Sequence, residues 1–272
     1  MGNQRFGWPV LKGPSRLAGM SLELIVIACG CFAASAFNAA FATGGVHITL
    51  AASSWVLPLA VAIPMQVALN APSLLARIFS FRQHIHWPIF VMFAPAAVLG
   101  VFIGTRVFIS LDEGVISLCL GGLLLALIWL VPDGIRLKSP DRFRLVGVLH
   151  GFFGTIFGVG LFLQPAVLRT ELGRLQITAT LAACLMMVEL VKGGSYAFVG
   201  FDYIEYWPHI LAGAATSLIG NLTGQRLGQL VSERLFRLVF KLLLTFVGLR
   251  LALKGVLLLA GYFAQLNFAV TN

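Results

Sequence analysis

The sequence predicts an all-α polytopic membrane protein made of two tandem homologous repeats of about 120 residues. Three observations support this: the composition, the spacing of apolar segments and a register of residues that recurs along the chain. Hydrophobic residues make up 59% of the chain and charged residues 11%, and the mean hydropathy is +0.94. A water-soluble domain of this composition would expose more apolar surface than water tolerates, so we expect the chain to lie in lipid.

Eight apolar segments with almost no charge are each long enough to cross a hydrocarbon core of about 30 Å as a helix. We expect helices because unsatisfied backbone groups are costly in lipid and no barrel-like alternation is visible. The segments are 21–43, 61–80, 88–108, 114–132, 145–163, 176–199, 207–228 and 235–262. Stretches 44–60 and 161–174 are apolar but slightly short, so they could be short crossings or re-entrant segments, which leaves eight to ten crossings open.

The repeat is visible as identical residues 120 positions apart. The pairs are Trp87-Pro88 with Trp207-Pro208, Ala94 with Ala214, Gly100 with Gly220, Gly104 with Gly224, Arg106 with Arg226, Glu113 with Glu233, Leu118 with Leu238, Leu123 with Leu243 and Leu124 with Leu244. A register this long indicates a tandem duplication. In a membrane protein a duplicated unit points first to a secondary transporter.

The repeat and the apolar segments together predict the domain organisation. We expect an N-terminal tail at 1–20, transmembrane repeat 1 at 21–132, a cytoplasmic connector at 133–144, transmembrane repeat 2 at 145–262 and a C-terminal tail at 263–272. The net charge of +9 lies in the connectors, which is the positive-inside pattern of membrane proteins and does not indicate a nucleic-acid partner.

Connector charges predict that the two repeats are inverted relative to each other. The basic connectors hold Arg77 and Arg82 in the first half and Arg234, Arg237 and Lys241 in the second, whereas their repeat equivalents hold Asp202 and Glu205, and Asp112 and Glu113. A reversal of sign at both connectors is expected if equivalent segments cross the membrane in opposite directions. Inversion needs an odd number of crossings in each half, and it would leave the basic N-terminal tail outside. Eight crossings in parallel halves are the alternative.

The first apolar run, in the N-terminal region, resembles a secretory or lipoprotein signal. However, residues 35–44 align at an offset of 116 with residues 151–160, which cannot be a signal, so we expect the first helix to stay in the mature protein.

The four cysteines lie in apolar segments without histidines at ligand spacing, so we expect packing residues and no metal site.

Glycine clusters near the start of each half predict interrupted helices. The second half carries Gly151, Gly154, Gly158 and Gly160 before Pro165, and the first half carries Gly44-Gly45. An interrupted helix leaves N–H groups and a positive helix end at depth, where they can bind an anion. The candidate binding residues around the two breaks are Asn38, Thr43, Gly44, Gly45, His47, Thr155, Gly158, Gly160 and Gln164. The alternative is that the glycines only allow close helix packing.

Charged and polar residues inside apolar segments supply the other candidates. Glu189 and Lys192 are three residues apart on one helix face, so we expect them to pair, with Glu189 as a proton-coupling carboxylate and Lys192 as an anion contact. A structural ion pair with Lys192 snorkelling to the interface is the alternative. Gln66, Asn70, Thr178 and Thr180 are expected to bond between helices, and His47 could titrate near neutral pH or bond to another helix. Arg106 and Arg226, near helix ends, could gate the anion's access or simply snorkel.

Several of these motifs resemble the TauE/SafE family of membrane permeases, from about residue 21 to residue 262. They are the glycine-rich breaks, the connectors ending in Ile85-His86-Trp87 and Tyr206-Trp207, and the helices with Gly100-x-x-x-Gly104-x-Arg106 and Gly220-x-x-x-Gly224-x-Arg226. Ala42 and Leu161 stand where that family commonly has glycine. The resemblance implies export or uptake of sulfite, sulfonates or related small organic anions.

We therefore expect a secondary transporter of a small anion, driven by protons or by the substrate's own gradient, with alternating access of two repeats. The alternatives are a passive channel, a non-transporting membrane partner and, less favoured, an intramembrane enzyme, for which no hydrolase or metalloprotease motif occurs. We expect no cofactor. The expected partners are the anion, protons and lipid, with homo-oligomerisation left open, and the expected location is a bacterial inner membrane.

Overall fold

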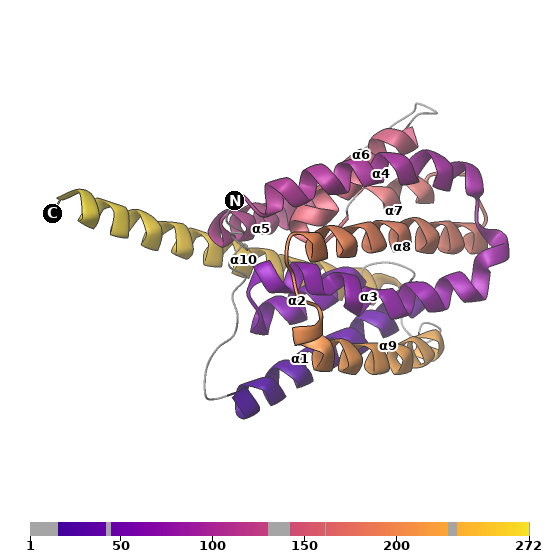
Figure 1. Ribbon diagram of the computed structural model, residues 1–272. Coiled ribbons are helices and arrows are strands. Elements are labelled where there is room, and N and C mark those ends of the chain that lie inside the picture. The colour runs from indigo at the N-terminus through magenta and orange to yellow at the C-terminus, as the bar shows by residue number, and fades with distance from the viewer. Residues whose placement is uncertain (1–15, 42–44, 130–141, 161, 228–232, 272) are drawn as a thin grey trace. The chain divides into compact units, whose positions relative to one another are not determined.

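The computed structural model describes residues 16–41, 45–129, 142–160, 162–227 and 233–271, and these residues form helices and the turns between them (Figure 1). In chain order the helices are α1 (Arg16–Phe41), α2 (Gly45–Val56), α3 (Leu59–Phe81), η1 (Arg82–His84), α4 (Trp87–Phe108), α5 (Glu113–Trp129), α6 (Arg142–Phe157), α7 (Leu163–Leu168), α8 (Arg174–Phe198), η2 (Ile204–Tyr206), α9 (Trp207–Leu227) and α10 (Glu233–Thr271). The predicted all-α class is confirmed. The tail at 1–15 and most of the predicted connector at 133–144 lie outside the described residues.

Five helices within the described residues are long and apolar enough to cross a membrane. The spans are Leu22–Ala40, Leu59–His84, Trp87–Phe108, Leu175–Phe198 and Leu244–Tyr262, and the shorter stretch Glu113–Ala126 is also apolar. The predicted stretches 44–60 and 161–174 contain the short helices α2 and α7. At 1.5 Å per residue these are only about 18 Å and 9 Å long, so neither can cross a bilayer alone.

The helices fall into two compact units that do not coincide with the two halves of the chain. The first unit contains α1–α4 and α6–α9, and the second contains α5 and α10. Each half of the sequence therefore contributes helices to both units. In the first unit, buried side chains from α4, α6, α7 and α8 form a continuous apolar core, which includes Phe93, Phe143, Leu163 and Cys184.

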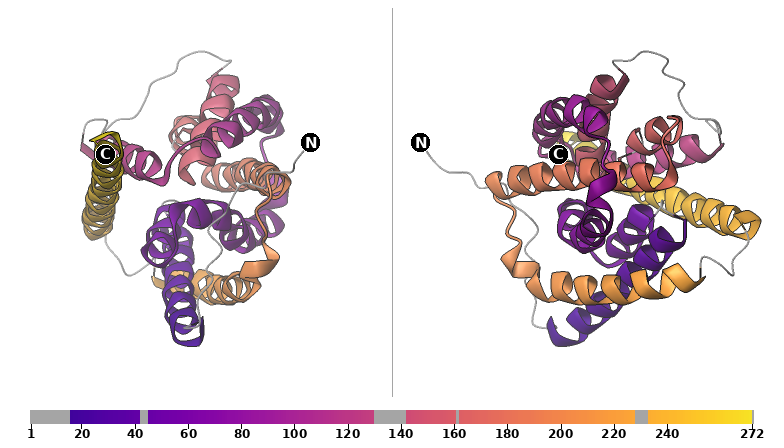
Figure 2. Two further views of the ribbon diagram at one scale, coloured as in Figure 1. Left: turned by 60° about the vertical axis from the view of Figure 1, so that its left-hand side comes forward. Right: turned by 90° about the vertical axis from the view of Figure 1, so that its right-hand side faces the viewer.

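Glycines bring two pairs of helices into backbone contact in the first unit, and the two views in Figure 2 show α4 beside α6 and α1 beside α9. A Cβ atom on Gly100 would collide with the carbonyl oxygen of Val148, and one on Gly104 would lie 2.8 Å from the carbonyl oxygen of Phe152. In the same way, a Cβ atom on Gly220 would collide with the carbonyl oxygen of Phe32, and one on Gly224 would collide with the carbonyl oxygen of Ala36. Because residue numbers rise together along both contacts, α4 runs parallel to α6, and α1 runs parallel to α9.

Other contacts fix the remaining helix directions. On α3 and α8, Val67 meets Gly193, and the Tyr203 hydroxyl after α8 donates to the Pro64 carbonyl at 3.3 Å, so these helices are antiparallel. The backbone N–H of His86 donates to Thr180, and the ring of Phe108 contacts Tyr196, so α4 runs parallel to α8.

The short helix α2 folds back between α1 and α3. Gly30 on α1 faces Ala52, while Asn38 faces Gly45, so α2 runs antiparallel to α1. Gln66 Nε2 donates to Ser53 Oγ at 3.0 Å, which requires a second reversal before α3. Consecutive helices from α1 to α4 therefore alternate in direction.

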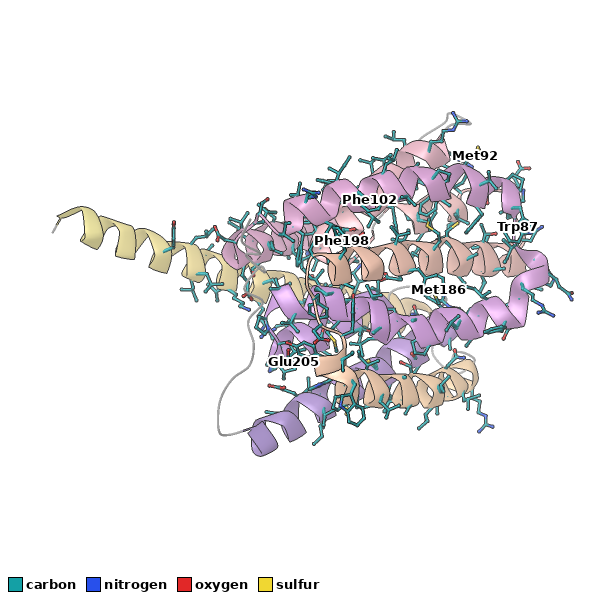
Figure 3. All side chains as sticks on the ribbon, in the orientation of Figure 1. Trp87, Met92, Phe102, Met186, Phe198 and Glu205 are labelled. Carbon is teal, nitrogen blue, oxygen red and sulfur yellow. The ribbon has the colours of Figure 1, made fainter. Side chains whose placement is uncertain are left out.

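Opposite charges gather at the two ends of the first unit. Figure 3 shows Trp87, at the start of α4, at one end, and Phe198 and Glu205 at the other. The helix directions place Arg82, Arg142, Arg144, Arg169 and Arg226 at or near the Trp87 end. The other end holds Glu23, Asp202 and Glu205, together with Arg106. An excess of arginine at one end of a helical bundle is the pattern on which the positive-inside rule rests.

The second unit is an antiparallel pair of helices. Lys254 Nζ on α10 pairs with Glu113 Oε1 on α5 at 2.8 Å, and at the other end Lys241 Nζ lies 3.8 Å from the centre of the Trp129 ring. Between these contacts, Gly121 packs against the backbone of Gly248 and Ala252. The pair is thus held by close packing in the middle and by charged side chains at both ends.

Gly100→Ala tests the glycine contact between α4 and α6. The new methyl group would meet backbone atoms that cannot move aside, so we expect a loss of about 1–3 kcal/mol in the free energy of unfolding. Gly194→Ala is the matched control, because nothing lies within 4 Å of a Cβ atom there. Denaturation of both purified variants in detergent would measure the difference, and equal stability would contradict the packing argument.

Candidate functional site

A polar cavity lies within the first unit, among α1, α2, α3, α6, α7, α8 and α9 and the segment that joins α6 to α7. Its volume of about 50 Å³ is room for several water molecules or one compact anion. Its polar lining comprises Ser35, Asn38, Thr49, Asn70, Ser73, Arg77, His150, Gln164, Glu189, Lys192 and Ser217. Gly154, Gly158 and Gly160 complete the wall on the α6 side.

The predicted helix break in the second half is present after α6. The helix ends at Phe157, and Gly158 follows with a φ angle of +72°, which side chains with a Cβ atom rarely adopt. Two residues later, a Cβ atom on Gly160 would collide with the imidazole of His150. Both glycines therefore have structural reasons to be glycine, and both line the cavity.

A side chain accepts a hydrogen bond from the first N–H group of each short helix, α2 and α7. Asn38 Oδ1 accepts the N–H of Gly45, the first residue of α2, at 2.9 Å. His150 Nδ1 accepts the N–H of Leu163, the first residue of α7, at 3.2 Å. These two N–H groups are consequently bonded to the protein, although we expected the helix breaks to leave such groups free for an anion.

His150 was not predicted as a site residue. It is 2% exposed, it lines the cavity, and its ring packs edge-on against Phe93. Because Nδ1 accepts a hydrogen bond, the neutral ring carries its proton on Nε2 and can act as a donor. No sequence motif pointed to His150, since its partner is 13 residues away across the break.

Glu189 and Lys192 form the ion pair that their spacing predicted. Lys192 Nζ lies 3.1 Å from both carboxylate oxygens of Glu189, and both residues line the cavity. Lys192 is 1% exposed, so it does not snorkel. A buried charge pair is costly in an apolar surrounding unless it is well paired, and charged residues inside membrane spans are commonly functional.

Arg77 was assigned to a connector from the sequence, but it lies within α3, which continues to Phe81. Asn70, Ser73 and Arg77 follow one another at helical spacing and line the cavity together. Arg77 Nε donates to the carbonyl of Ser73 at 3.4 Å. The signal that could have found this face was the polar spacing of 70, 73 and 77 within an otherwise apolar helix.

The remaining predicted residues lie in different places. Thr43 and Gly44 are outside the described residues. His47 and Thr155 are buried but do not line the cavity, and the Thr155 carbonyl accepts a hydrogen bond from Tyr196. Arg106 and Arg226 are exposed near opposite ends of the first unit, so their gating role stays a prediction.

Two of the polar residues predicted to bond between helices do so: Gln66 bonds to Ser53, and Thr180 accepts from the backbone of His86. Asn70 instead bonds to Gln66 on its own helix and faces the cavity.

Cys184 packs in the core, as expected of a small apolar residue. Among the residues that the structure describes, no group of three or more potential metal ligands occurs.

The first unit is thus a bundle of apolar helices around a polar cavity, an arrangement typical of membrane transport proteins. The family described as "Sulfite exporter TauE/SafE" matches residues 26–251, and the chain belongs to this family of multi-pass integral membrane transporters, which are not enzymes. This confirms the predicted family resemblance.

A curated relative supports the same class. A "Probable membrane transporter protein" of Xylella fastidiosa (strain Temecula1) is 27% identical over 175 residues, which cover 57% of this chain and 62% of that protein. The chain thus aligns with less than two thirds of that relative's length. No solved structure matches the chain.

Gly160→Ala tests the contact between the helix break and His150. The added methyl group would overlap a buried ring, so we expect a loss of about 1–3 kcal/mol in the free energy of unfolding. Gly154→Ala should be better tolerated, since its Cβ atom would lie 3.6 Å from the nearest atom. In a His150→Ala background the cost of Gly160→Ala should largely disappear. Additive costs in this double-mutant cycle would show that the two residues do not interact.

Proposed function

We propose that this chain is a proton-coupled secondary transporter of a small oxyanion such as sulfite or a sulfonate, and that it works by alternating access. The observation that carries the proposal is the cavity, whose described lining holds two cationic side chains, Arg77 and Lys192, and one carboxylate, Glu189. An excess positive charge inside an apolar protein favours an anionic ligand. Hydroxyl and amide groups around the cavity are suitable neutral donors.

The second part of the proposal is that the two halves are inverted repeats. The helix directions support it, because α3 runs antiparallel to its repeat equivalent α8. A two-fold axis along the membrane normal would make equivalent helices parallel, whereas an axis in the membrane plane makes them antiparallel. Within the second unit, α5 and α10 also run antiparallel.

The glycine contacts support the same proposal. Gly100 and Gly104 meet Val148 and Phe152, while Gly220 and Gly224 meet Phe32 and Ala36. Adding 120 to the numbers of Gly100 and Gly104 gives Gly220 and Gly224, and subtracting 116 from those of Val148 and Phe152 gives Phe32 and Ala36. The two contacts therefore use repeat-equivalent positions. A duplicated unit accounts for such matching interfaces.

Glu189 is the proposed proton carrier. In the ionised form it neutralises Lys192, and in the protonated form it would leave Lys192 available for the anion. Proton and anion would therefore bind together and cross together. We place the transporter in a bacterial inner membrane with the arginine-rich end of the first unit in the cytoplasm.

Uptake by proteoliposomes tests the transport proposal. Wild-type protein should take up labelled sulfite, or methanesulfonate, with saturation and faster uptake under an imposed pH gradient. Glu189→Gln should remove the response to the gradient, because glutamine cannot release a proton. Since this variant leaves Lys192 without its carboxylate, Glu189→Gln with Lys192→Met serves as a folding control. Uptake that never saturates would instead indicate a channel, and absence of uptake would contradict the proposal.

Cysteine labelling tests the inverted topology. After Cys29 and Cys119 are replaced by serine, single cysteines at Arg82 and Phe236 should react with a membrane-impermeant reagent from one side. Cysteines at Asp112 and Asp202 should react from the other side. Reaction of the Arg82 and Asp202 positions from the same side would contradict inversion without affecting the transport proposal.

A further inference from the structure

Arg77 lines the cavity from a different helix than Lys192, the lysine that pairs with Glu189. It projects from α3, whereas Lys192 comes from the antiparallel helix α8. Arg77 is also close to the C-terminal end of α3, so it lies towards the arginine-rich, cytoplasmic end of the first unit. Asn70 and Ser73 line the cavity on the same face of α3.

The hydrogen bonds of Arg77 leave most of its donors available. Its Nε donates to the Ser73 carbonyl, and among the described residues no carboxylate pairs with its guanidinium group. By contrast, Lys192 is held by both oxygens of Glu189. A guanidinium group within a membrane-spanning helix is expensive, so a ligand that meets its terminal nitrogens would provide the missing partner.

The guanidinium group also restricts the shape of that ligand. Its two parallel N–H groups match two coplanar oxygens of a carboxylate, sulfonate or sulfite, and a lysine ammonium group cannot reproduce this two-point contact. We propose that Arg77 binds the head of the substrate through two oxygens, so that the site selects oxyanions over spherical anions such as chloride. This inference rests on the proposed transport of a small anion and adds the residue and the geometry that select it.

Arg77→Lys keeps the positive charge but removes the planar guanidinium group, so it tests the two-point contact alone. Arg82→Lys is the matched control, because Arg82 is exposed in η1 just beyond α3. In proteoliposomes we expect Arg77→Lys to raise the KM for sulfite or methanesulfonate roughly tenfold or more, with the maximal rate largely kept. Excess chloride should compete poorly in the wild type and better, relative to sulfite, in Arg77→Lys. Arg82→Lys should behave as the wild type.

The outcomes distinguish this inference from the proposed function. Saturable wild-type uptake with an unchanged KM in Arg77→Lys would overturn the role of Arg77 and leave the transport proposal intact. Absence of saturable wild-type uptake would overturn both. If Arg77→Lys is unstable in thermal unfolding, Arg77→Ala with added methylguanidinium replaces it: restored uptake supports the inference, and a stable variant without restoration overturns it.

Discussion

The need to satisfy backbone N–H groups away from water controls how this site can be built. A helix can be interrupted inside a bilayer only if other groups bond to the backbone that the interruption exposes. Here Asn38 bonds to the start of α2, and His150 bonds to the start of α7. Gly45 and Gly160 allow these side chains to come close, because a Cβ atom on either glycine would collide with its partner. The polar cavity lies beside these two bonded breaks.

Much of this arrangement could be predicted from local sequence. Helix positions follow from runs of apolar residues, and the Glu189–Lys192 pair follows from a spacing of three. The break after Phe157 follows from clustered glycines. These features depend on neighbours in the chain, so a single sequence is sufficient to find them.

Features that depend on tertiary contacts could not be predicted in the same way. His150 becomes a cavity residue because α6 and α7 fold back on each other, and no pattern in the sequence indicates that geometry. Arg77 was misassigned because an arginine near the end of an apolar run fits both a connector and a last helical turn. The direction in which its side chain faces depends on how α3 packs, and that was not visible in the sequence.

The charges around the cavity have an electrical consequence. With two cations and one carboxylate in the described lining, the empty site carries one net positive charge. Such a charge gains or loses about 2.3 kcal/mol for each 100 mV that it traverses. A monoanion and a proton that bind together add no net charge, so the loaded site carries the same positive charge as the empty one. The site therefore crosses the membrane with one positive charge in each direction, and a full cycle moves no net charge. The membrane voltage consequently changes the rates of the two crossing steps but not the anion gradient that the cycle can build.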